Sequence, residues 1–437
     1  MMNKADFRNF SLNDWLVYQE RLHPRAIDLG LGRVAAVLES LGWREPPPFL
    51  VVTVAGTNGK GSCVAILEAI LQAAGYCTAT YTSPHLLNYN ERIHLNKRTV
   101  SNAELRAAFT RIEVARGGIS LTYFEYGTLA ALDLFRHAKP DVIILEVGLG
   151  GRLDATNVIN ADVAVVTTVD LDHMDWLGTD RESIGREKAG IFRSGQPAVC
   201  GDPNPPLSLV DHAQTLGVPL YVQERDFGWR FSSSSREGDW EWWRQTKSSA
   251  EKIFYQRALP APRMRGIHQY QNVATALMAL TCLSDRLSVS SDTIRNTLQE
   301  VMVPGRFQVV TRGSAPWILD VAHNPQAAMA LAATLGKGHG RTIAVVAMLA
   351  DKDIPGTMAA MIDVVDVWHL ATLSVARGAP AARLADALIH LGSTAPFQLH
   401  HDVVTALAAA HSLVLPNDRI VVFGSFHTVS AALETAR

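Results

Sequence analysis

The sequence predicts an α/β fold, with an N-terminal P-loop NTPase-like domain on a parallel sheet and a smaller C-terminal Rossmann-like, doubly wound domain. Two observations predict it. Short apolar, β-branched runs alternate with helix-like stretches in both parts of the chain, which is typical of parallel strands covered by helices. A glycine-rich turn at residues 56–62 joins the first apolar run to a helix, as phosphate-binding loops do.

Size and composition narrow the class of protein. The chain has 437 residues, which suits two or three domains. Lys and Arg number 40 against 42 Asp and Glu, so the net charge of −2 gives no general attraction for nucleic acid or an anionic membrane. The four cysteines are scattered without a CxxC pair, as expected for reduced thiols. With no apolar signal segment and no run near the ~20 residues of a membrane span, we expect a cytoplasmic monomer acting on small molecules.

The first part of the chain contains the predicted parallel sheet. Its first strand, residues 49–54, is bounded by three prolines and the glycine-rich turn. Ser101, with Glu104 three residues on, marks the start of a helix. The further predicted strands are 77–82, 141–147, 162–168 and 197–200, and the predicted helices are 61–74, 101–116 and 124–138.

The sequence changes character at residues 225–255, which contain four serines in a row and four tryptophans among alternating charges. We expect an exposed antiparallel ribbon there, serving as a local hairpin or, alternatively, as a partner surface. A second alternating series follows Pro304-Gly305 and predicts the doubly wound domain. We therefore divide the chain into residues 1–295 and 296–437. The C-terminal strands are predicted at 317–321, 342–348, 364–370, 397–400 and 419–423, and the helices at 326–335, 357–363, 381–391 and 402–413.

The glycine-rich turn has the composition of a phosphate-binding loop. Its glycines free backbone N–H groups to surround phosphates, the following helix adds partial positive charge, and Lys60 supplies a full one. The spacing GTNGKGS departs from the usual GxxxxGK[ST], because two residues separate Gly56 from Gly59 and Gly61 follows the lysine. A tight glycine turn without a ligand is the alternative.

Polar side chains follow three strands of the predicted sheet. Glu146 ends one strand, Ser83 follows another, and His173 follows a third. Ligands of open α/β sheets gather at the carboxyl ends of strands, so these side chains are candidates for Mg²⁺ beside the phosphate loop. The alternatives are an ordinary strand-end carboxylate, a turn serine and a satisfied polar histidine. Local chemistry gives Lys188 no role beyond that of a surface lysine.

A series of segments, in order along the chain, resembles the folate branch of the Mur-type amide ligases, the dihydrofolate synthase/folylpolyglutamate synthase family. The variant loop points to this branch rather than to kinases or GTPases. The segments are DLGL at 28–31, AGTNGKGS at 55–62, YTSPHL at 81–86, LTYFE at 121–125, LEVGLGGRLDATN at 145–157, LDHMDWLG at 171–178, REKAGIF at 186–192, PGRF at 304–307, DVAHNP at 320–325 and GSFHTV at 424–429.

The resemblance implies a role for each matching position. It implies ATP contacts for Thr57, Asn58, Gly59, Lys60, Gly61, Ser62, Asn272, Arg306, Asp320 and His323. It implies two Mg²⁺ ions on Ser83, Glu146, His173 and a carbamylated Lys188, with Lys60, Lys188 and His173 serving catalysis. It implies a dihydropteroate site at Asp28, Leu29, Gly30, Leu31, Thr122, Tyr123, Phe124, Glu125, Leu153, Asp154 and Ala155, with Phe124 stacking on the pterin. The departures are Asp170, where a less polar residue is usual, and the stretch 225–255.

The activity that the resemblance implies is ATP-dependent ligation of L-glutamate to dihydropteroate and to reduced folates. ATP phosphorylates the acceptor carboxylate, and the amine of glutamate displaces phosphate from the acyl phosphate. No nucleophilic side chain is needed, and neither a Cys–His nor a GxSxG signal is present. The alternatives are folylpolyglutamate synthesis alone, another Mur-type ligase such as one acting on a cell-wall precursor, and a nucleotide-binding scaffold without activity.

Overall fold

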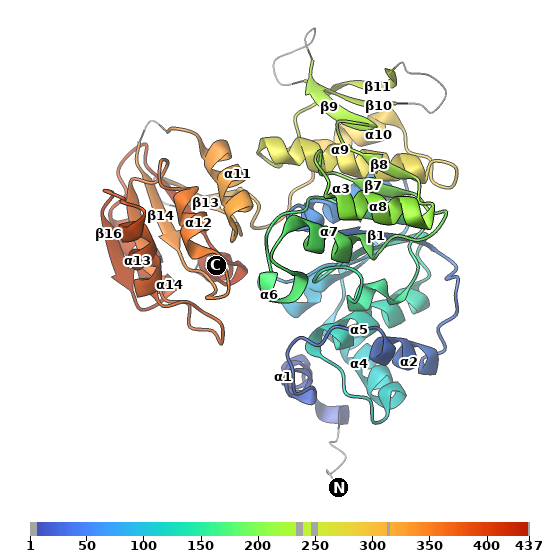
Figure 1. The fold of residues 1–437 in the computed structure, drawn as a ribbon. Helices are drawn as coiled ribbons and strands as arrows, with labels where there is room; N and C mark the ends of the chain where they lie inside the picture. The colour runs from blue at the N-terminus through green and yellow to red at the C-terminus, as the bar shows by residue number, and fades with distance from the viewer. Residues whose placement is uncertain (1–6, 233–238, 246–251, 313–314, 339, 436–437) are drawn as a thin grey trace.

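A computed structural model of the chain describes residues 7–435 except 233–238, 246–251, 313–314 and 339. The larger sheet has eight strands, and the six from β2 to β8 in spatial order run parallel (Figure 1). The predicted parallel sheet is therefore confirmed, with β3, β4 and β8 in addition. In spatial order the strands are β4 (Arg98–Thr99), β3 (Ile93–Leu95), β2 (Thr78–Tyr81), β5 (Val142–Glu146), β1 (Leu50–Ala55), β6 (Val163–Val166), β7 (Ala198–Cys200) and β8 (Leu220–Val222).

Helices cover both faces of this sheet because successive strand residues point to opposite sides. Val52 and Val54 pack into one core, whereas Val51 packs into another. The first core includes α3 (Lys60–Ala73), α9 (Ile267–Cys282) and α10 (Ser291–Leu298), and the second includes α1 (Leu12–Leu22), α2 (Gly32–Ser40), α4 (Asn102–Arg116) and α5 (Tyr123–Ala138). Short α6 (Met174–Leu177), with α7 (Arg181–Ala189) and α8 (Leu207–Leu216), belongs to a third core beside β6–β8. One-turn 3₁₀ helices lie at η1 (Phe7–Asn9), η2 (Tyr89–Arg92) and η3 (Ala155–Val158).

The C-terminal sheet has six strands, of which β12 is antiparallel to the others. The five predicted strands are present, whereas the edge strand β12 and the last helix α15 were missed. Predicted helix 357–363 instead begins at Ile354, since Asp353 caps it and Pro355 occupies its first turn. The strands in spatial order are β12 (Gln308–Arg312), β13 (Ala315–Leu319), β17 (Arg419–Phe423), β14 (Thr342–Val346), β15 (Val367–Ala371) and β16 (Phe397–His400). The helices are α11 (Pro325–Leu335), α12 (Ile354–Ala359), α13 (Ala381–His390), α14 (Val403–Ser412) and α15 (Phe426–Glu434).

The tryptophan-rich stretch forms a three-stranded antiparallel sheet of β9 (Phe227–Phe231), β10 (Trp240–Gln245) and β11 (Lys252–Leu259). The antiparallel prediction is confirmed, but the prediction that the stretch is exposed is wrong. Trp240, Trp242 and Trp243 are buried, and the Trp242 indole donates to the Ala274 carbonyl of α9 at 3.2 Å. The sheet therefore caps the α9 side of the N-terminal core. Part of the predicted serine run lies outside the described residues.

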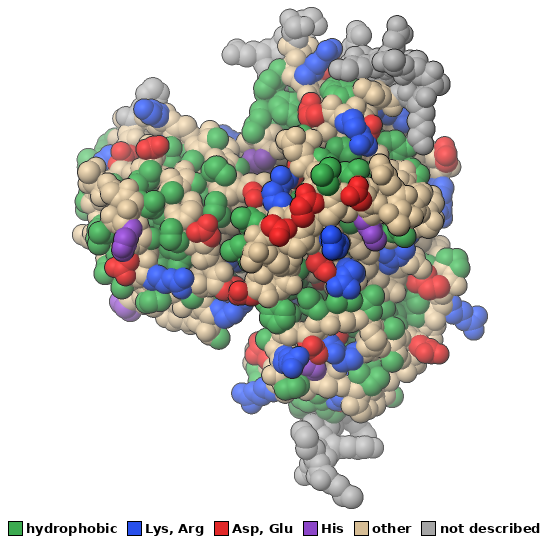
Figure 2. Space-filling model, viewed as in Figure 1, with side chains coloured by type: hydrophobic (Ala, Val, Ile, Leu, Met, Phe, Trp, Pro, Cys, Tyr) green, Lys and Arg blue, Asp and Glu red, His purple; other side chains and the backbone are tan. Residues whose placement is uncertain are grey.

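Acidic and basic side chains are interspersed over the face shown in Figure 2, in keeping with the net charge of −2. Among the residues described, no helix is long and apolar enough to cross a membrane.

Candidate functional site

A cleft of about 780 Å³ lies between the two domains, and both contribute its walls. The N-terminal domain supplies the carboxyl ends of β1, β2, β5 and β6, as expected for a ligand site on a parallel sheet. All the site residues that the sequence predicts line the cleft except Leu31. Leu31 instead occupies the N-cap position of α2, outside the residues that line the cleft.

The phosphate loop lies between β1 and α3 and is held in shape by close neighbours. Gly59 has φ +87°, and a Cβ there would lie 2.4 Å from the Asn272 side-chain oxygen. The Thr57 hydroxyl donates to the Asp170 carbonyl at 3.0 Å, and the Asp170 amide donates back to that hydroxyl. Asp170, the departure from the family pattern, thus engages the loop through its backbone. Asn272 is placed against the loop, as the resemblance implied.

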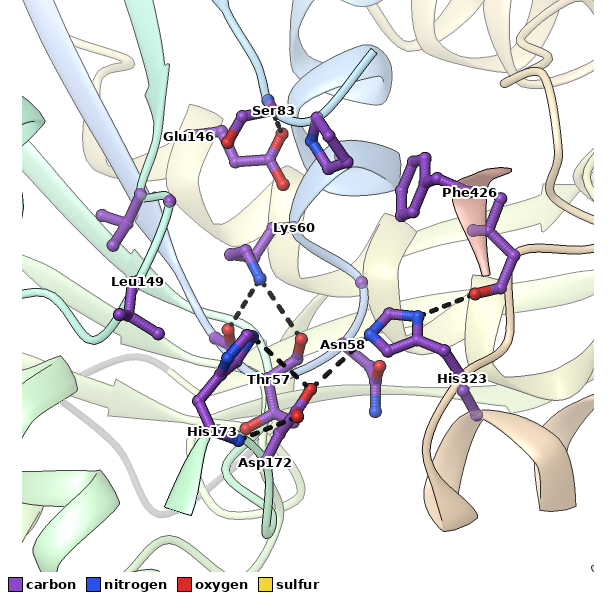
Figure 3. Close-up of a pocket in the computed structure, with 18 of the residues that line it drawn as sticks. Thr57, Asn58, Lys60, Ser83, Glu146, Leu149, Asp172, His173, His323 and Phe426 are labelled. Carbon is purple, nitrogen blue, oxygen red and sulfur yellow. Dashed lines mark hydrogen bonds and ion pairs between the residues drawn. The ribbon is translucent and has the colours of Figure 1, made fainter. Parts of the chain in front are cut away.

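Lys60 begins α3 and lies half-buried in the wall of the cleft. Its ammonium donates to the carbonyls of Gly56 and Thr57 at 3.0 and 3.2 Å. Burial lowers the pKa of Lys60, although Glu146 and Asp172 oppose this shift by attraction. Lys60 thus lies at the centre of the site, with the carboxylates of Glu146 and Asp172 on opposite sides of it (Figure 3).

The strand-end residues divide into two groups around Lys60. Ser83 and Glu146 lie on one side, where the Ser83 amide donates to the Glu146 carboxylate at 3.1 Å, and His173 lies on the other beside Asp172 (Figure 3). Burial raises the pKa of Glu146, whereas burial lowers that of His173 to about 4. His173 is therefore a neutral imidazole at neutral pH, the form that binds metals. Among the described residues, no three His, Cys, Asp or Glu side chains are close enough together to hold a metal by themselves.

Asp172 and Lys352 form a contact that the sequence reasoning missed. The Lys352 ammonium, from the turn before α12, lies 2.5 Å from an Asp172 oxygen, and both side chains are less than a tenth exposed. His323 lies 3.6 Å from the other Asp172 oxygen. Burial favours the neutral acid, but His323, Lys352 and His173 outweigh it and hold the pKa of Asp172 well below its usual range. The segment LDHMDWLG contained this carboxylate, but no sequence signal joined it to Lys352.

Two further residues of the C-terminal domain face the phosphate loop. Arg306 is half-buried, with its guanidinium 5.4 Å from the centre of the Phe426 ring, and desolvation lowers its pKa against the attraction of Asp320 and Glu146. Asp320 accepts backbone hydrogen bonds from Phe307 and Ala322 at 2.8 and 2.9 Å. Asp320 therefore both shapes the linker and balances the charge of Arg306.

An apolar shelf lies at the N-terminus of α5. The Phe124 ring packs against Gly148, where a Cβ would lie 2.5 Å from the ring, and its centre is 5.8 Å from that of Tyr81. Thr122 caps α5 in a capping box with Glu125, which sequence reasoning also missed. The fixed start of the helix holds Phe124 at the cleft wall, where a flat aromatic ligand can stack on it.

A partly buried network joins the early segment to this shelf. Arg33 donates to Asp28 at 2.6 Å and to Glu125 at 3.1 Å, and the Gly30 amide donates to the Leu153 carbonyl at 3.3 Å. The segments 28–30, 122–125 and 153–155 are thereby brought together, as the resemblance implied. The Asp154 carboxylate is engaged by the protein itself, because it accepts hydrogen bonds from the backbone amides of Leu149 and Thr156. It therefore stabilises the loop around the shelf.

Lys188 is buried near the end of α7 and lines the cleft, so the reading of a plain surface lysine is wrong. Within the described chain its amine has no hydrogen bond or ion pair. Burial, assisted by repulsion from Lys60, lowers its pKa to about 7. A large share of this amine is therefore neutral at neutral pH and nucleophilic.

Two family models match the chain, the Mur ligase middle domain over residues 54–201 and the Mur ligase glutamate ligase domain over residues 305–426. Curated relatives match almost throughout. The chain is 48% identical to the dihydrofolate synthase/folylpolyglutamate synthase of Escherichia coli K12, over 97% of this chain and 95% of that protein. It is 40% identical to the enzyme of the same name from Haemophilus influenzae, over 98% of each.

Solved structures match as closely. Escherichia coli FolC in complex with DHPP and ADP superposes with a TM-score of 0.88 at 47% identity, covering 98% of both chains. A bifunctional folylpolyglutamate synthase/dihydrofolate synthase with Mn, AMPPNP and L-glutamate bound superposes with a TM-score of 0.87 at 46% identity, again over 98% of both.

Proposed function

This chain belongs to the dihydrofolate synthase/folylpolyglutamate synthase family of Mur-type ligases, and from that premise we propose how its cleft carries out the reaction. The chain is an ATP- and divalent-metal-dependent amide ligase. It joins L-glutamate to 7,8-dihydropteroate, giving dihydrofolate, and to the γ-carboxylate of reduced folates. One observation carries the proposal: the phosphate loop around Lys60 and the Phe124 shelf open into the same cleft, which Lys352 of the second domain closes.

The nucleotide lies along the phosphate loop in this proposal. The amides of residues 57–62 and the N-terminus of α3 suit its phosphates, and Lys60 turns from its own loop carbonyls to the terminal phosphate. Asn272, Arg306, Asp320 and His323 surround the rest of the nucleotide from α9 and the second domain. The domain boundary, predicted after residue 295, is better placed after residue 301, because α10 and Val301 pack on the N-terminal core, and residues 302–307 then connect the two domains.

The donors fit Mg²⁺ held mainly by the nucleotide. Glu146 offers a buried carboxylate beside Ser83, and His173 offers a neutral nitrogen on the opposite side of Lys60. Magnesium usually takes one or two protein ligands and completes its shell with phosphate and water. It therefore does not need a group of three His, Cys, Asp or Glu side chains, which the described residues do not provide. When bound, the ion neutralises charge on the transferring phosphoryl group. Ser83 and Glu146 would hold one ion, and His173, on the other side of Lys60, would hold a second.

The reaction then needs positioning and exclusion of water more than side-chain chemistry. A carboxylate oxygen of the acceptor attacks the γ-phosphorus of ATP, the bond to ADP breaks, and an acyl phosphate forms. The neutral amine of glutamate adds to the acyl carbon, phosphate leaves, and the nitrogen loses its extra proton. Lys60 stabilises the transferring phosphoryl group, and Lys352 holds the second domain across the cleft so that water is kept from the acyl phosphate.

Lys188 carries a carbamate in the working enzyme. The proposal is supported by a buried amine with a pKa of about 7, because carbon dioxide adds to the neutral amine and not to the ammonium form. The product is an anion inside a cleft that contains Lys60, and it can ligate the second Mg²⁺. The negative charge of the carbamate would thus have Lys60 and Mg²⁺ as partners, whereas the ammonium of an unmodified Lys188 would be repelled by both.

Glutamate enters at the wall formed by the second domain. Arg377 lines this wall, and so does Ser425, which caps the N-terminus of α15. A cation and a helix N-terminus suit a carboxylate ligand. The enzyme acts as a cytoplasmic monomer on small molecules, and its free cysteines, of which Cys63 and Cys200 are buried, agree with a reducing compartment.

Product analysis tests the activity directly. The protein is incubated with ATP, Mg²⁺ and L-glutamate, and either dihydropteroate or tetrahydrofolate serves as acceptor. A glutamylated product with each acceptor supports the proposal. Product from tetrahydrofolate alone would reduce it to folylpolyglutamate synthesis, and ADP release without any glutamylated product would refute it.

A further inference from the structure

Arg92 is a buried cation that lines the cleft and has no part in the chemistry described so far. It ends the short helix η2 and is 8% exposed. Its guanidinium lies 5.3 Å from the ring centre of Tyr89 and 5.5 Å from that of Tyr123. Its Nε donates to His85 Nδ1 at 2.9 Å, so one side chain holds it in place and two rings enclose it.

The neighbours of Arg92 do not neutralise it. In the described parts of the chain no carboxylate forms an ion pair with it, and the adjacent Glu91 is engaged by the amides of Leu86 and Asn88 at 2.8 and 2.7 Å. Burial raises the pKa of Tyr123 to about 12, so its phenol carries no charge at pH 7 that could balance the guanidinium. A buried charge without a counter-ion is expensive and is retained where a ligand supplies the opposite charge.

The position of Arg92 indicates which ligand. His85, its hydrogen-bond partner, follows Ser83 of the metal side by two residues, and Tyr123, which its guanidinium faces, precedes Phe124 of the shelf. Arg92 therefore contacts one residue near each end of the acceptor site.

We propose that Arg92 binds the non-reacting carboxylate of a folate acceptor. A folate carries two carboxylates on its terminal glutamate, whereas dihydropteroate carries one, which must react. The reacting carboxylate needs a free oxygen near Lys60, and a guanidinium fork would occupy its oxygens, so the fork suits the spectator group. Arg92 then distinguishes the two activities of one enzyme, an inference that rests on the proposed function.

Steady-state kinetics of Arg92→Met and Arg92→Lys test this inference with three acceptors. They are tetrahydrofolate, dihydropteroate, and tetrahydropteroyl-γ-aminobutyrate, which keeps the reacting carboxylate and lacks the spectator one. Arg116→Met is the control, since Arg116 is also largely buried and beside a tyrosine but lies outside the cleft, paired with Glu113. Thermal unfolding of each variant shows whether it has folded.

For Arg92→Met we expect the KM for tetrahydrofolate to rise about tenfold or more, with less than a threefold change for dihydropteroate. Arg92→Lys should recover part of the loss. For the γ-aminobutyrate acceptor, the KM of the wild type should already be as high as the KM of Arg92→Met for tetrahydrofolate. Arg92→Met should not raise the KM for the γ-aminobutyrate acceptor any further. Equal rises for all three acceptors, or no rise for tetrahydrofolate in a folded variant, would overturn the inference. A wild type that glutamylates no acceptor would instead overturn the proposed function.

Discussion

Lys352 of the C-terminal domain and Asp172 of the N-terminal domain form a buried ion pair across the cleft, with 2.5 Å between Nζ and Oδ1. The same surface contains a reciprocal amide pair, in which Asn58 of the phosphate loop and Asn324 exchange hydrogen bonds of 3.1 Å. The two domains therefore meet at the phosphate loop itself. Closure of the cleft and assembly of the site depend on the same few side chains.

Replacement of Lys352 by methionine should leave Asp172 buried without its cation. Removing one partner of a buried pair costs about 3–5 kcal/mol, and here the loss falls on the closed form. We expect kcat/KM for glutamate to fall by roughly two orders of magnitude or more, with the fold retained. Steady-state kinetics with varied glutamate measure this, and Lys337→Met, at an exposed lysine of the same domain, is the control.

The depressed pKa of Asp172 also predicts how the stability difference between the wild type and Lys352→Met varies with pH. The pKa of Asp172 is depressed in the folded protein, so the stability it contributes is present above its unfolded pKa and is lost only as pH falls through the folded value. The difference in stability between wild type and Lys352→Met should therefore be constant between about pH 6 and 8. A difference that disappears within this window would contradict the assignment of charge.

Lys60→Met should separate nucleotide binding from chemistry. The loop amides still bind phosphates, but the charge that stabilises the transferring phosphoryl group is gone. We expect kcat to fall roughly 10²–10³-fold, with a smaller change in the KM for ATP. Single-turnover ADP formation checks this, and near-normal ADP formation with lost product would be the contrary result.

Lys188→Met should abolish turnover and yet stabilise the fold in bicarbonate-free buffer. The pKa of Lys188 in the folded protein is about 7, below its usual value of 10.5, so the unfolded chain binds more protons and the wild type loses stability as pH falls from about 10 to 7. Below that range the penalty is complete and amounts to a few kcal/mol. Thermal unfolding at pH 6.5 should show a higher Tm for the variant, and a lower Tm would contradict the argument.

The carbamate has its own test. Activity of the wild type should depend on bicarbonate and rise with pH through about 7, as the amine of Lys188 loses its proton. Carbon-13 NMR with labelled bicarbonate should show a carbamate signal that is absent in Lys188→Met. Full activity in carbon-dioxide-free buffer, with no such signal, would exclude the modification.

Gly148→Ala should disturb the acceptor shelf alone. The new Cβ would lie 2.5 Å from the Phe124 ring, so the ring must move from its place. We expect the KM for dihydropteroate to rise about tenfold, since a stacked aromatic contact contributes ~0.5–1.5 kcal/mol beyond its buried area. Phe124→Ala should act in the same direction, while Phe231→Ala, at an exposed ring outside the cleft, should leave the KM unchanged.

The parallel strands and the polar residues at their ends could be predicted, because patterns within short stretches of sequence encode them. Apolar runs located the parallel strands, and the strand ends placed Ser83, Glu146 and His173 around Lys60, because carboxyl ends of parallel strands meet at one edge. Family resemblance then supplied Asn272 and Arg306, which lie far away in the sequence and nothing local would have selected.

The rest depended on contacts between distant segments. Lys352 looks like any turn lysine until the second domain docks it on Asp172, 180 residues away. The tryptophans of β10 read as exposed because charged residues alternate with them, yet α9 covers that face. Leu31 matches the same motif as Asp28 and Leu29 but lies at the start of α2 and does not line the cleft, because a matching segment can contain a helix start as well as ligand contacts.

The central claim is that the acceptor carboxylate is activated as an acyl phosphate in this cleft. The most direct measurement uses dihydropteroate labelled with heavy oxygen in its carboxylate, together with ATP, Mg²⁺ and L-glutamate, and mass analysis of the phosphate released. The account predicts that each phosphate carries one oxygen from the carboxylate, in step with the dihydrofolate formed. Phosphate without the label, alongside ADP and dihydrofolate, would contradict it.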